Sequence, residues 1–148
     1  MNREAVYNQL KLDEGVKYEI YKDHLGYPTF GVGHLITKDD DEYDEPMGTT
    51  VSEERVRECF ERDLNTSISE CKVLYEDFDD LPEEAQHIIC NMMFNMGRPR
   101  LSKFKGMKAG VDVRDWNAAA DEMVDSRWYT QVPNRARRLV DRMRALAD

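Results

Sequence analysis

Two carboxylates and a hydroxyl lie close together within the first 30 residues. Glu14 stands at the end of a helical pattern, and Asp23 and Thr29 follow on a segment whose residue types predict a β-hairpin. Paired carboxylates that face each other are the catalytic groups of most glycosidases. A lone Glu near a helix end, or a lone Asp near a turn, is more often solvated or capping. The pair alone therefore only suggests glycoside hydrolysis.

Two elements must position these groups. Residues 2–14 predict a short helix, because Val6 and Leu10 lie one turn apart on its apolar face. The spacing of apolar residues changes from helical to strand-like over residues 17–34. A turn around 24–26 there separates two short runs of aromatic and β-branched residues. Pro28 favours an edge position, since proline cannot donate a ladder hydrogen bond. The acidic segment 38–46 that follows is typical of a solvated loop.

Helices are predicted for most of the remaining chain. One begins near Thr50 or Ser52 and keeps apolar residues at helical spacing to Cys71, with Asp63 as an unexpected charge on that face. The next opens at Pro82, is apolar nearly all round from 85 to 96, and ends at Gly97 and Pro99. Shorter helices are expected over 115–125 and 133–147.

The pattern as a whole predicts an α+β fold in one domain. A small hairpin lobe of about residues 15–50 is expected to pack against a helical lobe of about residues 51–148 plus the N-terminal helix. The helix over 85–96 is expected in the centre of the core, because it has no polar face.

Composition narrows the function classes. The chain has 148 residues and a net charge of −9, but residues 98–148 carry 12 basic and 7 acidic side chains against 9 and 23 in residues 1–97. An acidic protein is a poor candidate for nucleic-acid binding that depends on phosphate contacts. No apolar run reaches the roughly 20 residues of a membrane span, and no signal peptide is evident. Three cysteines without CxxC spacing favour buried core thiols over a metal site or disulfides, and no cofactor is expected.

Four motifs then carry a specific resemblance. They are DEG (13–15), YKDHLGYPTFGVGH (21–34), NMMFNMG (91–97) and SRWYTQVPNRARR (126–138). In this order and at these spacings, the chain resembles the phage-type (T4-like) lysozymes, glycoside hydrolase family 24, over nearly its whole length.

The resemblance implies hydrolysis of the β-1,4 bond between N-acetylmuramic acid and N-acetylglucosamine in bacterial peptidoglycan. Glu14 matches the general acid of the family, Asp23 its second carboxylate, and Thr29 the residue beside the attacking water. The family inverts at the anomeric carbon, so room for that water predicts about 6.5–9.5 Å between the two carboxyl groups.

Other matches concern binding and support. Leu35 and Phe94 match residues that line the saccharide cleft of the family, whereas Met107 and Glu122 depart from its pattern at two outer cleft positions. Arg135 matches an arginine that pairs with the catalytic glutamate. His34 and Asp63 match an ion pair that links the hairpin lobe to the long helix, a structural rather than a catalytic role.

The biological role follows from the same resemblance. We expect a monomeric endolysin that stays in the host cytoplasm until a separate holin opens the inner membrane to the periplasm and cell wall. Familiar relatives are strongly basic, so wall attraction in this acidic chain is predicted to reside in the arginine-rich face of residues 127–144. Two alternatives remain open: a non-catalytic wall-binding or virion structural module, and a lytic transglycosylase that forms an anhydro sugar without water.

Overall fold

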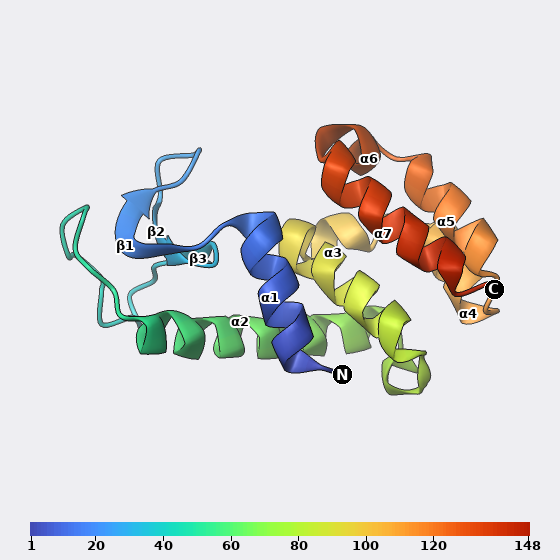
Figure 1. The fold of residues 1–148 in the computed structure, drawn as a ribbon, viewed down its shortest axis with the longest axis horizontal. Helices are drawn as coiled ribbons and strands as arrows, with labels where there is room; N and C mark the ends of the chain where they lie inside the picture. Colours follow the sequence, from blue (N-terminus) through green and yellow to red (C-terminus); the bar gives the residue numbers. More distant parts are fainter. The chain divides into compact units, whose positions relative to one another are not determined.

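The computed structural model describes all 148 residues, with seven α-helices and one small antiparallel sheet (Figure 1). The fold class is α+β, as the sequence predicts. The chain divides into two compact units, an N-terminal unit of Arg3–Thr66 and a C-terminal unit of Met1–Asn2 with Ser67–Asp148. That the whole chain forms one domain stays a prediction.

The N-terminal unit contains the elements around the two carboxylates. Helix α1 (Arg3–Glu14) precedes strands β1 (Lys17–Lys22), β2 (Pro28–Gly31) and β3 (His34–Leu35), and α2 (Glu53–Leu74) begins in this unit. The strands lie in the order β1-β2-β3, with Tyr21 opposite Thr29 and Phe30 opposite His34. The predicted hairpin is confirmed, and β3 is an addition to it.

A continuous apolar core holds these elements together. Leu10 of α1, Phe30 of β2 and Leu64 of α2 are fully buried. Tyr7 of α1 packs on Phe60 of α2 with ring centroids 4.6 Å apart. Because aromatic and branched side chains each bury a large apolar area, this core fixes the direction in which α1 and the sheet present their polar groups.

The C-terminal unit is helical. After the 3₁₀ turn η1 (Phe78–Asp80) it contains α3 (Glu83–Leu101), α4 (Lys105–Asp112), α5 (Trp116–Val124), α6 (Arg127–Gln131) and α7 (Pro133–Ala145). Helix α3 is buried around most of its surface, as its apolar sequence predicts. Helices α4 and α5 approach closely, since a Cβ on Gly110 would lie 2.7 Å from the backbone nitrogen of Ala119.

The predicted end of α3 is a break rather than a stop. Gly97 has φ 78° and ψ 166°, a conformation that is nearly exclusive to glycine, and one further helical turn follows it to Leu101. Helices α4 and α6 were not assigned from the sequence, because each offers only one or two turns of periodic pattern.

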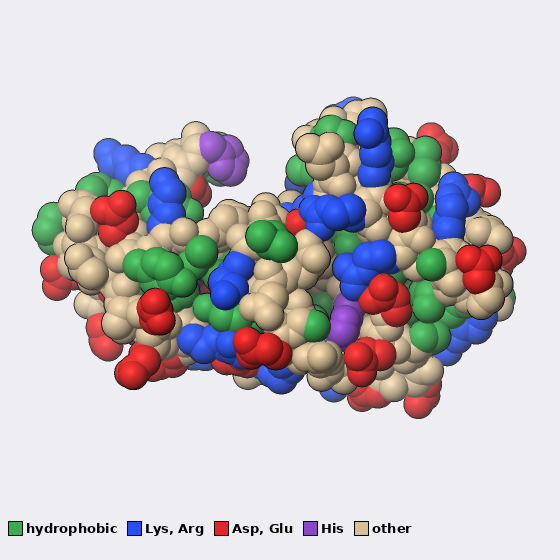
Figure 2. Space-filling view, in the orientation of Figure 1, with side chains coloured by type: hydrophobic (Ala, Val, Ile, Leu, Met, Phe, Trp, Pro, Cys, Tyr) green, Lys and Arg blue, Asp and Glu red, His purple; other side chains and the backbone are tan.

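The cysteines, the apolar character of the helices and the surface charges concern the chain as a whole. Cys59, Cys71 and Cys90 are all buried and free, which confirms their assignment as core residues. None of the helices combines the length and the apolar character that crossing a lipid bilayer requires. On the face shown in Figure 2, basic and acidic side chains alternate over each unit and form no continuous surface of one sign.

Candidate active site

Asp23 lies in the turn between β1 and β2 and holds that turn together. Its Oδ1 accepts hydrogen bonds from the backbone N–H groups of Leu25 and Tyr27, both at 2.9 Å. The backbone N–H of Asp23 donates to the carbonyl of Tyr27, also at 2.9 Å. An aspartate that accepts from the residues after it is a recognised turn former. The turn thus fixes the orientation of the carboxylate through Oδ1. The other oxygen, Oδ2, can accept a hydrogen bond from a water or a substrate.

Thr29 is buried on β2, and its hydroxyl donates to the carbonyl of Tyr27 at 3.0 Å. The sheet register places it opposite Tyr21 of β1 and opposite Leu35 of β3. With its proton committed to a carbonyl, the hydroxyl oxygen keeps its lone pairs as acceptors. Thr29 can therefore accept a hydrogen bond from a water or a sugar hydroxyl.

Glu14 is the last residue of α1 and is half-buried. A Cβ built on Gly33 would lie 3.8 Å from its Oε2, so the glycine-rich segment between β2 and β3 passes close to this carboxylate. Burial raises the pKa of Tyr21, and the carboxylates of Asp23 and Glu14 raise it further. Both carboxylates therefore lie within electrostatic reach of one phenol, whose strand neighbour is Thr29.

His34 of β3 lies between two carboxylates. Its Nδ1 is 2.7 Å from Oδ2 of Asp63 on α2, and its Nε2 is 2.9 Å from Oδ2 of Asp40. Ionised carboxylates only accept hydrogen bonds, and only an imidazolium can donate from both ring nitrogens, so the two partners favour the protonated ring. Burial alone would lower the pKa of His34, but the hydrogen bonds and charges of Asp63 and Asp40 raise it.

Asp40 is the centre of a larger network. It is only 7% exposed, and its Oδ2 also accepts from the backbone N–H of Thr37 at 2.8 Å. Its Oδ1 lies 3.5 Å from Arg55 and 3.4 Å from Arg62, both on α2. Burial works to raise the pKa of Asp40, but these hydrogen bonds and the neighbouring cations lower it. The network joins β3 and the following loop to α2.

The sequence interpretation missed Asp40. Segment 38–46 was expected to be a solvated loop, and this is wrong for Asp40, which is buried, and for Glu42, which forms a two-point contact with Arg55 at 2.8 and 2.9 Å. The available signal was Thr37 three residues before Asp40, a spacing typical of a side chain that closes a local turn.

His34, Asp40 and Cys59 bring three possible ligand atoms within 4.8 Å of one another. A cation there would need a lone pair from His34, whose two nitrogens both face carboxylates. It would also meet Arg62, which donates to Sγ of Cys59 at 3.3 Å. The donor set fits a hydrogen-bonded ionic network, and we assign no metal to it.

The remaining predicted residues divide between the units. Leu35 is exposed on β3 of the N-terminal unit. In the C-terminal unit, Phe94 is half-buried on α3, and Arg135 of α7 is buried with Nε donating to Oδ1 of Asn91 at 2.8 Å. Met107 is fully buried at a hollow of about 230 Å³, and Glu122 packs against Gly106 at the same hollow.

The sequence matches the family model described as phage lysozyme over residues 11–145. It is 34% identical to probable T4-type lysozyme 2 of Dictyostelium discoideum, over 90% of this chain and 89% of that protein. It is 30% identical to the endolysin of Salmonella phage P22, over 76% of this chain and 74% of that protein. It is also 30% identical to the pre-baseplate central spike protein Gp5 of Enterobacteria phage T4, over 88% of this chain and 26% of that protein.

Proposed function

Because the chain belongs to the phage lysozyme family and is a glycosidase of the lysozyme type, we propose that it cleaves peptidoglycan. The bond is the β-1,4 link between N-acetylmuramic acid and N-acetylglucosamine. The observation that carries this proposal is the grouping around Tyr21, with Glu14 and Asp23 in electrostatic reach and Thr29 opposite in the sheet. A binding module has no need of two carboxylates and an acceptor hydroxyl at one place.

In this proposal Glu14 is the general acid. As the glycosidic bond breaks, the leaving oxygen takes the proton of Glu14, which avoids release of an alkoxide. The sugar ring develops oxocarbenium character, and the ionised Asp23 stabilises it or accepts a proton from the attacking water. Asp23 is well suited to a fixed role, because two backbone N–H groups hold its Oδ1.

Thr29 completes the set as the residue that orients the water. A water that donates to Oγ1 of Thr29 and to Asp23 would keep both lone pairs and present one of them to the anomeric carbon. Attack from the face opposite the acid inverts the configuration and requires about 6.5–9.5 Å between the carboxyl groups. Leu35 and Phe94 are proposed to contact the saccharide, and Arg135 to support Glu14.

The proposed biological role is lysis of a bacterial host from within. The endolysin of Salmonella phage P22 is similar to most of this chain, which supports that role. Release to the wall through a holin and a monomeric state are part of the same proposal.

The test compares wild type with Glu14→Gln on purified Gram-negative peptidoglycan. We expect loss of turbidity with wild type, none with Glu14→Gln, and full activity with Glu45→Gln, a matched change at an exposed loop carboxylate. Failure of a folded wild type to clear the wall would instead indicate a binding module.

Product analysis distinguishes the two reaction types. Hydrolysis adds one water and leaves a reducing N-acetylmuramic acid, whereas transglycosylation leaves a 1,6-anhydro sugar that is lighter by one water. Mass spectrometry separates these products. NMR of the first-formed anomer reports inversion, and a β-anomer would contradict the assignment of water attack to Asp23 and Thr29.

A further inference from the structure

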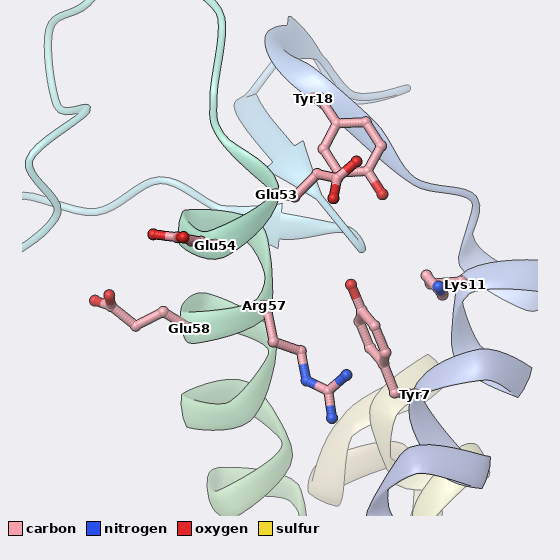
Figure 3. Close-up of a pocket in the computed structure, with 7 residues that line it drawn as sticks. All are labelled: Tyr7, Lys11, Tyr18, Glu53, Glu54, Arg57 and Glu58. Carbon is pink, nitrogen blue, oxygen red and sulfur yellow. The ribbon is translucent and has the colours of Figure 1, made fainter.

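A groove lies in the N-terminal unit, built from residues not assigned to the candidate active site. Its volume of about 680 Å³ is within the range of small-molecule sites. Helix α1, strand β1 and the first turns of α2 form its walls (Figure 3). The lining residues are Tyr7, Lys11, Tyr18, Glu53, Glu54, Arg57 and Glu58.

Tyr7 is a largely buried residue that directs its hydroxyl into this groove. The residue is only 7% exposed, and its ring packs on Phe60. Its hydroxyl points toward Tyr18 and Glu53 in Figure 3 and reaches the solvent of the groove, with no hydrogen-bond partner in the protein. Burial raises the pKa of Tyr7, so the phenol stays a neutral donor and acceptor. A hydroxyl that faces solvent without a partner in the protein is free to form hydrogen bonds with a ligand.

The charged groups around Tyr7 are of both signs. Lys11 and Arg57 flank its ring, at 4.4 and 4.0 Å from the centroid. Arg57 is held by ion pairs to Glu4 and Glu61, both at 2.9 Å. Lys11 has no carboxylate partner.

The carboxylates of the groove also include both a paired and an unpaired group. Glu58 pairs with Arg55 at 2.6 Å, and Glu54 and Glu58 point away along the outer side of α2. Glu53 has no cationic partner, and its carboxylate faces the same space as the hydroxyls of Tyr7 and Tyr18. The groove therefore offers one ammonium, one carboxylate and two phenols for hydrogen bonds.

This set favours neither sign of charge in a ligand. The carboxylate of Glu53 opposes an anion that Lys11 and Arg57 attract, and the two cations oppose an amine that Glu53 attracts. A neutral polyhydroxyl ligand meets neither penalty, because each hydroxyl can donate to Glu53 and accept from Lys11 or a phenol. Tyr18 is 39% exposed and offers an apolar ring face to the C–H face of a pyranose.

From these contacts we propose that the groove is a second saccharide-binding site. It would hold a glycan strand at a place distinct from Glu14, Asp23 and Thr29. The site itself is argued from its own side chains, and only the choice of an N-acetylglucosamine polymer as ligand rests on the proposed function. Retention on a polymeric substrate would keep the enzyme near its next bond.

The experiment is an NMR titration of the ¹⁵N-labelled full chain with the β-1,4-linked trisaccharide of N-acetylglucosamine. We expect saturable shifts in the amides of Tyr7, Lys11, Tyr18 and Glu53. Tyr18→Ala should weaken binding at this groove about tenfold, since it removes the stacking surface. Tyr7→Phe keeps the ring and the fold but removes the hydroxyl, and should weaken binding about fivefold. Tyr43→Ala is the matched control, as Tyr43 is 44% exposed in the same unit but does not line the groove.

The same spectra separate this inference from the proposed function. Shifts at Asp23 and Thr29 without shifts at Tyr7 and Tyr18, up to the solubility limit, would overturn the second site and leave the proposed active site intact. Shifts at Tyr7 and Tyr18 alone would support the second site and count against the proposed function. Shifts by lysine amide but not by the trisaccharide would overturn the saccharide assignment in favour of an amine site.

Discussion

At the scale of single residues, Asp23 combines a structural and a chemical role. Its Oδ1 closes the β1–β2 turn through Leu25 and Tyr27, while its charge is the part that catalysis would use. An asparagine keeps an acceptor oxygen for the turn but loses the charge. We therefore expect Asp23→Asn to reduce the rate of peptidoglycan hydrolysis at least about 100-fold while the melting temperature changes little.

The comparison variant is Asp23→Ala, which removes the turn acceptor as well. It should lower the stability by about 1–2 kcal/mol, because two backbone N–H groups lose their partner. Thermal denaturation of the two variants checks this. An Asp23→Asn protein that retains wild-type activity would remove Asp23 from the mechanism.

His34 leads to a prediction about pH. The raised pKa of His34 means that its ion pairs stabilise the fold fully below about pH 6.5 and that this contribution is lost as the pH rises through the folded-state value. The lowered pKa of Asp40 acts in the opposite direction, so its contribution is present above about pH 4 and is lost as the pH falls through its folded-state value. The network is strongest between these limits.

We expect His34→Asn to destabilise the protein by about 2 kcal/mol near pH 5–6, less than the roughly 3–5 kcal/mol for breaking a fully buried pair, because Asp63 is partly exposed. The difference from wild type should shrink steadily above pH 7. Urea denaturation over a pH series measures it, with His24→Asn in the exposed β1–β2 turn as the control. A difference that stays constant with pH would mean that the His34 charge does not stabilise the fold.

At the scale of elements, the sequence predicted long helices well and short or polar features poorly. Helices α2 and α3 have enough turns for their apolar spacing to be unambiguous. Strand β3 has two residues and no detectable alternation of its own. Asp40 looked like a solvated residue because burial by Arg55, Arg62 and His34 depends on contacts distant in sequence.

The two candidate sites also differ in how well the sequence predicts them. Glu14, Asp23 and Thr29 could be selected because one short segment holds all three in a recognisable motif. The groove around Tyr7 could not, because it joins α1, β1 and α2 through residues that form no local pattern. Nothing in the sequence near Tyr7 indicates that its hydroxyl lacks a partner.

Gly31 offers a test of how tightly the sheet packs on α2. It has φ +66°, and an added Cβ would lie 3.1 Å from a methyl group of Val56. We expect Gly31→Ala to cost about 2–3 kcal/mol, from backbone strain plus overpacking. Gly26→Ala is the matched control, because its φ is +86° but nothing lies within 4 Å of its Cβ position. It should cost only about 1 kcal/mol.

Thermal denaturation of both glycine variants measures the difference. Since the two positions share a left-handed backbone, the excess loss at Gly31 isolates the contact with Val56. Equal losses would mean that the sheet shifts to accommodate the methyl group.

At the scale of the whole molecule, the charge distribution sets how the protein meets an anionic wall. The net charge is −9, and only residues 98–148 carry an excess of basic groups. The structure reduces that excess further, because Arg142 pairs with Glu84 at 2.6 Å and Arg144 with Asp121 at 2.8 Å. The arginine-rich face of residues 127–144 is thus partly neutralised from within the C-terminal unit.

Arg137 and Arg138 belong to the same face and are exposed on α7, where their charges can act on a wall. Replacing both with Gln should lower the initial rate on whole peptidoglycan several-fold at low ionic strength, because long-range attraction increases the rate of encounter. The loss should fade above about 0.15 M salt, where the screening length falls to roughly 8 Å. Turbidity assays over a salt series measure this.

Arg142→Gln would not test this attraction cleanly, since it leaves Glu84 unpaired and lowers the stability of the fold. If the double variant matches wild type at every salt concentration, the acidic enzyme reaches its substrate without electrostatic help, and binding to uncharged glycan becomes the main source of its affinity for the wall.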